Sequence, residues 1–318
     1  MTRRKNKLVF IIKWALMIAA YGFLAYKLAN IEYWEELRHS FSSLNTKRVI
    51  YLIVVLLMMP LNWAIETGKW QILTSKVVRL TFINALKGVL AGLNTGFVTP
   101  GRLGEFAGRV MYLPENTKWI GILLSLVNGF TQTLIITIVG LVSSYVYFSH
   151  FKSSNDYLPY LNFILGFFMV GIVLYFVFPS IITKLKRQSW AVKFRDTLKS
   201  LSQFDGKSLF LILFCSALRY SVFCVQYFFM LHFFNIEISA IEALVAIPTM
   251  YLFITYTPSL AASEAAIRGS LAVLILGIFS NNEIGILLTG ILIWFINFIL
   301  PMLAGSVLMI RSDSVSKS

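Results

Sequence analysis

The chain has 318 residues, of which 58% are hydrophobic and only 13% charged, and its formal net charge is +14. Soluble domains carry about 25% charged residues and lack repeated apolar runs of membrane-spanning length, so this composition excludes a soluble enzyme or binding domain and indicates an all-α polytopic membrane protein. The Lys and Arg residues gather in loops, which favours anionic membrane lipids over nucleic acid as partners.

Six apolar stretches have the length of a membrane-spanning helix, about 20 residues for a roughly 30 Å hydrocarbon core. They cover residues 8–28, 50–66, 119–148, 158–181, 208–234 and 285–310. The first follows a basic cluster, but it contains Lys13 and Lys27 and no small-residue cleavage site follows it. We therefore expect an uncleaved span rather than a signal peptide.

Two weaker pairs of segments lie between these spans: residues 81–98 with 104–113, and residues 240–256 with 264–279. A Thr-Pro step interrupts each pair. We expect each pair to be re-entrant, entering the membrane and returning to the face that it left. The alternative of eight or ten full crossings would require the short, charged segment 104–113 to span the bilayer.

Basic residues concentrate at residues 67–80, at residues 182–207 and at the C-terminal end. Because Lys and Arg favour cytoplasmic loops, we expect a multi-pass protein of the bacterial inner (plasma) membrane with cytoplasmic N- and C-termini. The outer loop at residues 29–49 also carries basic residues, which is a mild exception.

The two Thr-Pro steps, Thr99-Pro100 and Thr257-Pro258, lie 158 positions apart and suggest two related halves. Residues 1–150 hold three spans and the first re-entrant pair, and residues 151–318 repeat this order from the opposite face. Inverted repeats are a recurring plan of secondary transporters, whose substrate site lies near the midplane. A basic amphipathic linker, residues 185–207, is expected to lie on the inner leaflet. Its apolar face comprises Trp190, Phe194, Leu198 and Leu201.

Each motif also carries a Glu followed four residues later by an Arg, namely Glu105 with Arg109 and Glu264 with Arg268. This spacing places both charges on one helical face, where they can neutralise each other. A charge within a membrane segment is costly and is a functional-site hypothesis by default. Two interpretations stay open, because the pairs can act as structural clamps for the turns or as part of a substrate site.

The chain breaks at Pro100, Gly101 and Pro258 expose free N–H groups and a helix dipole, both of which favour a bound anion. Arg102 lies between the glycines, has no carboxylate three or four residues away except through a turn, and is the predicted free cation for a phosphate. The predicted substrate site comprises Thr99, Pro100, Gly101, Arg102, Glu105, Arg109, Thr257, Pro258, Glu264 and Arg268.

A second group of polar residues lies within the predicted membrane segments: Asn62, Glu66, Asn94 and Arg219. The repeat spacing places Arg219 opposite residue 61, beside Asn62 and Glu66. A contact between Glu66 and Arg219 is therefore a hypothesis. Cys215, Cys224 and three scattered His residues give no metal motif, so we predict no metal site and no cofactor. We find no catalytic constellation and expect no enzyme.

The motifs TPGRLGE (residues 99–105) and TPSLAASE (residues 257–264) resemble the TPGxxGE-type and PGGxGxxE-type signatures of the lysylphosphatidylglycerol synthetase transmembrane-region family, the flippase-like integral membrane proteins. The second motif departs from the family pattern because it lacks the glycines. The resemblance covers nearly the whole chain. It implies the stand-alone form of the family, which lacks the soluble aminoacyltransferase domain and moves or binds lipids or lipid-linked glycans.

We therefore predict a flippase-like protein that translocates or binds an anionic lipid or polyprenyl-linked lipid. One alternative is an ion-coupled small-solute transporter, in which Glu105 and Glu264 hold a proton or cation. Another is a lipid-modifying transferase with Glu105 as nucleophile or base, and a third is a membrane scaffold. The sequence does not reveal the oligomeric state.

Overall fold

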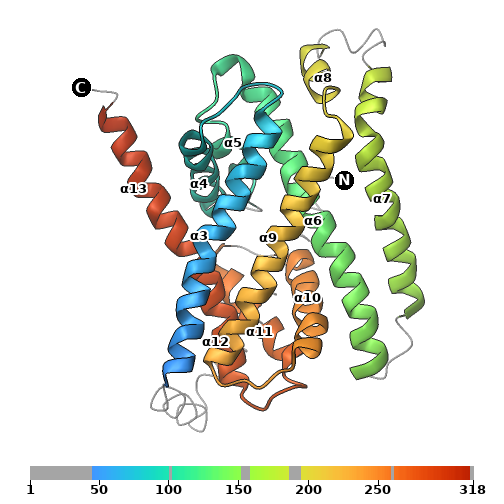
Figure 1. The fold of residues 1–318 in the computed structure, drawn as a ribbon, viewed down its shortest axis with the longest axis vertical. Helices are drawn as coiled ribbons and strands as arrows, with labels where there is room; N and C mark the ends of the chain where they lie inside the picture. Colours follow the sequence, from blue (N-terminus) through green and yellow to red (C-terminus); the bar gives the residue numbers. More distant parts are fainter. Residues whose placement is uncertain (1–44, 100–101, 152–157, 186–194, 259–260, 316–318) are drawn as a thin grey trace, which may run out of the picture.

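The computed structural model describes residues 45–99, 102–151, 158–185, 195–258 and 261–315. Regular structure within these ranges is helical throughout (Figure 1). The expected first span at residues 8–28 and the Pro100-Gly101 step lie outside the described residues.

Five segments of the described chain are long and apolar enough to cross a membrane. They are α3 (Thr46–Thr74), α6 (Lys118–Val146) with the π-helical turn Tyr147–Phe151, α7 (Leu158–Leu185), α9 (Gly206–Phe233), and α12 (Glu283–Trp294), which continues through the π-helical turn Phe295–Ile299 into α13 (Leu300–Val315). Large apolar side chains such as Phe163 and Phe167 on α7 point outward, as expected for a surface that faces lipid. Five of the six predicted spans are thus confirmed.

Helix α3 is longer than the predicted span 50–66, and this corrects two predicted loops. The helix starts at a cap formed by Asn45, whose side chain accepts a hydrogen bond from the backbone N–H of Arg48 at 3.0 Å. At the other end, Lys69 lies 3.4 Å from Glu66, one turn away on the same helix. Arg48 and Lys69 are therefore buried helical residues rather than members of basic loops.

Two pairs of shorter helices occupy opposite halves of the molecule (Figure 1). Helices α4 (Phe82–Val98) and α5 (Gly104–Arg109) lie in the upper half, and α10 (Ala240–Tyr256) and α11 (Ala261–Leu276) lie in the lower half. Both α4 and α10 have 17 residues, or about 25 Å at 1.5 Å per residue, and both end directly before the Thr of a Thr-Pro step. The helical pairs are as predicted; their re-entrant path stays a prediction.

Glycines explain how α5 packs so closely on α4. A Cβ at Gly92 would lie 2.9 Å from the backbone oxygen of Glu105, and a Cβ at Gly88 would lie 2.9 Å from that of Arg109. On the facing side, a Cβ at Gly108 would overlap the backbone oxygen of Ala91. Small residues at this spacing let membrane helices approach closely, so α5 is held with Arg109 turned toward the protein interior.

The described part of the amphipathic linker forms the short helix α8 (Arg195–Leu201), with Leu201 buried. Trp190 and Phe194 lie outside the described residues. The turn after α3, helix α8 and the end of α13 lie at the same end of the molecule (Figure 1), which is the grouping that the topology predicts. Which end faces the cytoplasm stays a prediction.

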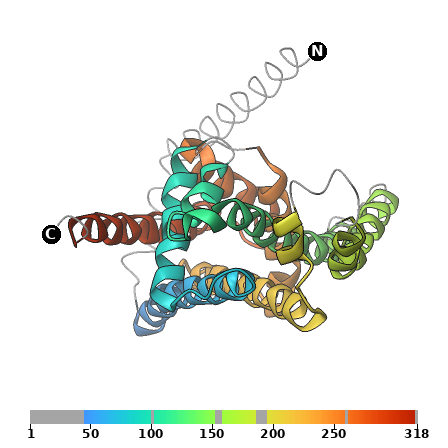
Figure 2. The same cartoon turned by 90° about the horizontal axis from the view of Figure 1, so that it is seen from above.

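Seen from above, α7 and α13 lie on opposite sides of a central group of helices (Figure 2). Two apolar clusters fill this central group. One is built around Trp63, Trp70 and Val89, and the other around Tyr227 and Met250. The polar side chains described next lie where these two clusters meet.

Candidate functional site

Arg109 of α5 joins the first motif to the neighbouring span. Its Nη2 donates to Glu105 Oε1 at 2.7 Å, one helical turn back, and to Glu66 Oε1 of α3 at 2.5 Å. Only 4% of Arg109 is exposed. The predicted Glu105–Arg109 pair is therefore present, but Arg109 also pairs with a carboxylate that is 43 positions away in the chain.

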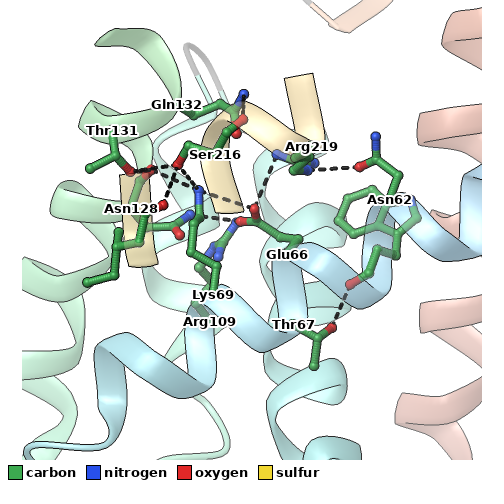
Figure 3. Close-up of polar contacts among 12 residues, drawn as sticks. Asn62, Glu66, Thr67, Lys69, Arg109, Asn128, Thr131, Gln132, Ser216 and Arg219 are labelled. Atoms are coloured by element: carbon green, nitrogen blue, oxygen red, sulfur yellow. Dashed lines mark hydrogen bonds and ion pairs between the residues drawn. The ribbon is translucent and has the colours of Figure 1, made fainter. Parts of the chain in front are cut away.

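Glu66 is the centre of the buried charge cluster and is fully inaccessible (Figure 3). Besides Arg109, its carboxylate lies 3.3 Å from Arg219 Nη1 and 3.4 Å from Lys69 Nζ, and it accepts a hydrogen bond from Asn128 Nδ2 at 2.8 Å. A buried carboxylate needs such partners because desolvation alone would cost several kcal/mol. The Glu66 carboxylate thus connects α3 to α5 and α9 through ion pairs, and to α6 through the hydrogen bond from Asn128.

Arg219 lies near the middle of α9, a position where an unpaired charge would be most costly. Its Nε donates to Asn62 Oδ1 at 2.8 Å, and its guanidinium stacks 5.3 Å from the ring centroid of Trp63. The hypothesised contact between Glu66 and Arg219 is confirmed. The repeat spacing was the sequence signal that located it.

Lys69 is a member of the cluster that the sequence interpretation missed. Its Nζ donates to Ser216 Oγ at 3.1 Å and to the backbone oxygen of Asn128 at 3.3 Å (Figure 3). We had assigned it to a basic loop because it follows the predicted end of the span. The i, i+3 spacing from Glu66 was the signal that could have placed it inside the helix.

The second motif forms a matching pair on α11. Arg268 Nη2 donates to Glu264 Oε1 at 3.1 Å, and Trp294 Nε1 donates to Glu264 Oε2 at 3.2 Å. Arg102 of the first motif also approaches this carboxylate, with Nη1 3.9 Å from Oε1. Arg102 is therefore not the free cation that the sequence suggested, because Glu264 comes from the other half of the chain.

Phe298 holds the two arginines of this second group side by side. The guanidinium carbons of Arg102 and Arg268 lie 4.3 Å and 5.2 Å from its ring centroid. Stacking on an aromatic ring stabilises a cation and fixes the plane of the guanidinium. The two motifs thus meet at Glu264 and Phe298.

A cavity of about 460 Å³ lies between the two motifs. Among the described residues, its charged lining consists of Glu66, Glu105, Glu264, Arg102, Arg109, Arg219 and Arg268. Four arginines and three glutamates give a formal surplus of one positive charge. Thr257, Asn128 and Gln132 add neutral polar groups. Burial strengthens electrostatic interactions, so this lining favours an anion with several oxygen acceptors.

Three further predicted residues, Thr99, Asn94 and Pro258, are not among the residues that line the cavity. The hydroxyl of Thr99 accepts a hydrogen bond from the backbone N–H of Gly104 at 2.7 Å and donates to the backbone oxygen of Thr95 at 3.0 Å, so Thr99 fastens the chain break itself. Asn94 contacts Ser306 on α13. Pro258 is exposed, and Pro100 and Gly101 lie outside the described residues.

Comparison with known protein families shows to which family the chain belongs. The family described as Lysylphosphatidylglycerol synthase TM region matches residues 10–305. The chain belongs to this lysylphosphatidylglycerol synthase transmembrane-region family. Searches of the curated proteins and of the solved structures return no significant match.

Family membership confirms the resemblance seen in the motifs and makes the chain a multi-pass membrane protein. The match spans both Thr-Pro motifs and all five long apolar segments, except for the last residues of the fifth. Every charged residue lining the cavity therefore belongs to the lysylphosphatidylglycerol synthase transmembrane region. Within the described residues, no group of three His, Cys, Asp or Glu side chains is arranged to hold a metal ion.

Proposed function

We propose that this protein binds the anionic headgroup of a lipid in the polar cavity and translocates that lipid between the leaflets. The observation that carries the proposal is the cavity lining, in which four arginines outnumber three glutamates inside a bundle of helices long enough to cross a membrane. Such a surplus of positive charge is costly in a membrane protein unless an anion balances it.

Unused hydrogen-bond donors at the cavity add support. Among the described residues, Arg109 Nη1 and Arg268 Nε are buried and have no hydrogen-bond partner. Buried donors are normally paired, and an unpaired one is expected to have a role or a missing partner. A phosphate group supplies acceptor oxygens that a guanidinium binds with high geometric specificity.

A lipid fits this site better than a fully polar solute. Only the headgroup needs a polar environment, because the hydrocarbon chains can stay in the bilayer during transfer. The family description names lysylphosphatidylglycerol, a phospholipid, which agrees with a lipid ligand. A polyprenyl-linked phosphate has the same chemistry at the cavity.

In this proposal the two halves, residues 1–150 and 151–318, form an inverted repeat around the cavity, and both termini are cytoplasmic. The helical pairs α4–α5 and α10–α11 act as re-entrant elements that reach the site from opposite faces. An anion competes with Glu264 for Arg102 and Arg268, so its arrival weakens the contact between the two motifs. The protein acts as a carrier and not as an enzyme.

One observation favours a second candidate function, an ion-coupled small-solute transporter. Glu105 and Glu264 both line the cavity, and carboxylates at membrane depth serve as proton or cation sites in transporters. Dependence of uptake on an ion gradient distinguishes this candidate from lipid translocation.

The test is scrambling of fluorescent phosphatidylglycerol and phosphatidylcholine in proteoliposomes, with no ion gradient applied. We expect the protein to accelerate transfer of the anionic lipid, and we expect Arg102→Gln to reduce that acceleration at least about tenfold, the effect of losing roughly 1.4 kcal/mol of binding. Arg102 suits this test because its side chain is 34% exposed and its ion pair with Glu264 is long, and the aliphatic part of Gln can still pack on Phe298, so we expect the fold to tolerate the substitution.

Arg79 provides the matched control. It carries the same charge in the turn between α3 and α4 and does not line the cavity. Arg79→Gln should leave transfer of phosphatidylglycerol unchanged. Equal transfer by the wild type, Arg102→Gln and protein-free vesicles would exclude lipid translocation.

A further inference from the structure

A second hollow, separate from the charged one, runs along the outside of α6, α9 and α10. It has a volume of about 400 Å³, and none of the described residues that line it is charged. Its hollow shape comes from small side chains, chiefly Ala217 and Ser221 of α9 and Ala240 and Ala243 of α10. Val139 and Leu244 lie at its rim and are exposed, so the hollow, which we call the apolar groove, opens to the surroundings of the bundle.

The apolar groove adjoins the polar cavity. Tyr220 lines both, and its hydroxyl is buried. The ring of Tyr220 packs 6.0 Å from that of Tyr251, which also lines the cavity. The side chain of Tyr220 therefore borders both hollows.

The groove and the cavity are built on the same three helices. On α10 the groove residues run from Ala240 to Pro248 and the cavity residues from Tyr251 to Thr255, and on α6 the groove residue Val139 lies beyond the cavity residue Ile136. On α9 the two hollows overlap, because the groove residues run from Ala217 to Phe228 and the cavity residues from Arg219 to Phe223. Figure 1 shows α10 beside α9 and α6 in the lower half of the molecule.

The length of the groove suits one hydrocarbon chain in one leaflet. On α9 its lining extends from Ala217 to Phe228, about 16 Å at 1.5 Å per residue. This is close to half of the roughly 30 Å hydrocarbon core, which is the depth that a lipid chain occupies in a leaflet.

We propose that the apolar groove binds one hydrocarbon chain of the same lipid whose anionic headgroup occupies the polar cavity. The inference rests on the proposed function and deepens it, because it makes the substrate an amphiphile with both parts held by protein. The lipid then enters sideways from the bilayer, between α9 and α10. Ordinary bilayer lipid covering the groove independently of the cavity is the competing outcome.

A hydrocarbon chain of the substrate lipid and ordinary bilayer lipid are distinguished by whether occupancy of the groove depends on headgroup binding in the cavity. Phosphatidic acid carrying a photoreactive diazirine in the middle of one chain is incorporated into phosphatidylcholine nanodiscs that hold the protein. After illumination, mass spectrometry locates the crosslinked residues. We expect crosslinks at groove residues of α9 and α10 in addition to those on the exposed face of α7, where any bilayer lipid contacts the protein.

The decisive comparison uses Arg102→Gln, which weakens headgroup binding without touching the groove. Groove crosslinks should fall at least about tenfold, whereas crosslinks on α7 should stay constant. Ser221→Trp, at an exposed position of the groove, should remove the groove crosslinks directly. Val170→Trp, at an exposed position of α7, is its matched control and should remove none of them.

Three unfavourable outcomes have different meanings. If phosphatidic acid binds better than phosphatidylcholine and depends on Arg102, but its chain crosslinks outside the groove, the chain site is wrong and the proposed function survives. If phosphatidylcholine carrying the same diazirine crosslinks to the groove equally well, and these crosslinks are insensitive to Arg102→Gln, ordinary bilayer lipid fills the groove and the proposal is overturned. If the protein shows no preference for an anionic lipid at all, the proposed function falls as well.

Discussion

Neutralising Glu66 should destabilise the protein strongly, and more than neutralising its partner Arg219. Glu66 is fully buried and faces three cations, Arg109, Arg219 and Lys69, at 2.5, 3.3 and 3.4 Å. Leaving one partner of a buried ion pair without its counter-charge typically costs about 3–5 kcal/mol. We expect Glu66→Gln to lower the free energy of unfolding by that amount.

The difference in cost between Glu66→Gln and Arg219→Gln follows from the charges that are in contact. Glu66, Glu105, Lys69, Arg109 and Arg219 sum to a formal charge of +1. Glu66→Gln raises this to +2, whereas Arg219→Gln lowers it to zero. The second substitution removes charge-assisted hydrogen bonds and should cost about 1–3 kcal/mol. The double variant restores +1 and should cost less than the two single variants together.

The assay is equilibrium unfolding in mixed detergent–SDS micelles, monitored by tryptophan fluorescence. Glu115→Gln is the control, because Glu115 pairs with Lys118 at the surface and its side chain is 88% exposed. It should change the free energy of unfolding by less than about 1 kcal/mol. Equal costs for Glu66→Gln and Arg219→Gln, with a simply additive double variant, would refute the charge argument.

Three further predictions concern the scaffold. Gly108→Ala should lower the free energy of unfolding by about 1–3 kcal/mol, because the added Cβ meets the backbone of α4. Gly68→Ala, whose Cβ would have no atom within 4 Å, should raise it by roughly 0.5–1 kcal/mol, and the same unfolding assay compares the two variants. Tyr147→Phe should cost about 1 kcal/mol, since the buried hydroxyl donates to a backbone oxygen of α11 at 2.9 Å, and amide exchange at that end of α11 should rise. The hydrogen bond from Ser208 lowers the pKa of Asp205 at the start of α9, so the ionised Asp205 carboxylate stabilises the protein at neutral pH, and this stabilisation is lost as the pH falls through the lowered pKa. In the Asp205→Asn variant, the melting temperature should therefore depend less on pH in the acidic range than it does in the wild type.

The long helices could be predicted from the sequence because each is encoded locally. An apolar run of about 20 residues has few stable conformations in a bilayer other than a helix, so five spans were found without knowledge of their neighbours. Helix ends were less certain. The end of α3 was misplaced because Lys69 looks like a loop residue until its partners from other helices, Asn128 and Ser216, are known.

In the candidate site, too, contacts within one helix could be predicted from the sequence, and contacts between helices mostly could not. Pairs within one helix turn, such as Glu264 with Arg268, follow from spacing alone. The approach of Arg102 to Glu264 and the contact of Arg109 with Glu66 join residues far apart in the chain, and they depend on how the helices pack. The spacing of 158 residues between the two Thr-Pro motifs was the one sequence feature that carried such information, and it led to the contact between Glu66 and Arg219.

The central claim is that the polar cavity holds an anionic headgroup. The most direct test measures the affinity of phosphatidic acid and of phosphatidylcholine for the purified protein in nanodiscs, comparing wild type, Arg102→Lys and Arg102→Gln. The account predicts selective binding of phosphatidic acid that Arg102→Lys largely keeps and Arg102→Gln weakens about tenfold or more. Equal affinity for both lipids, or anionic selectivity that survives Arg102→Gln unchanged, would contradict it.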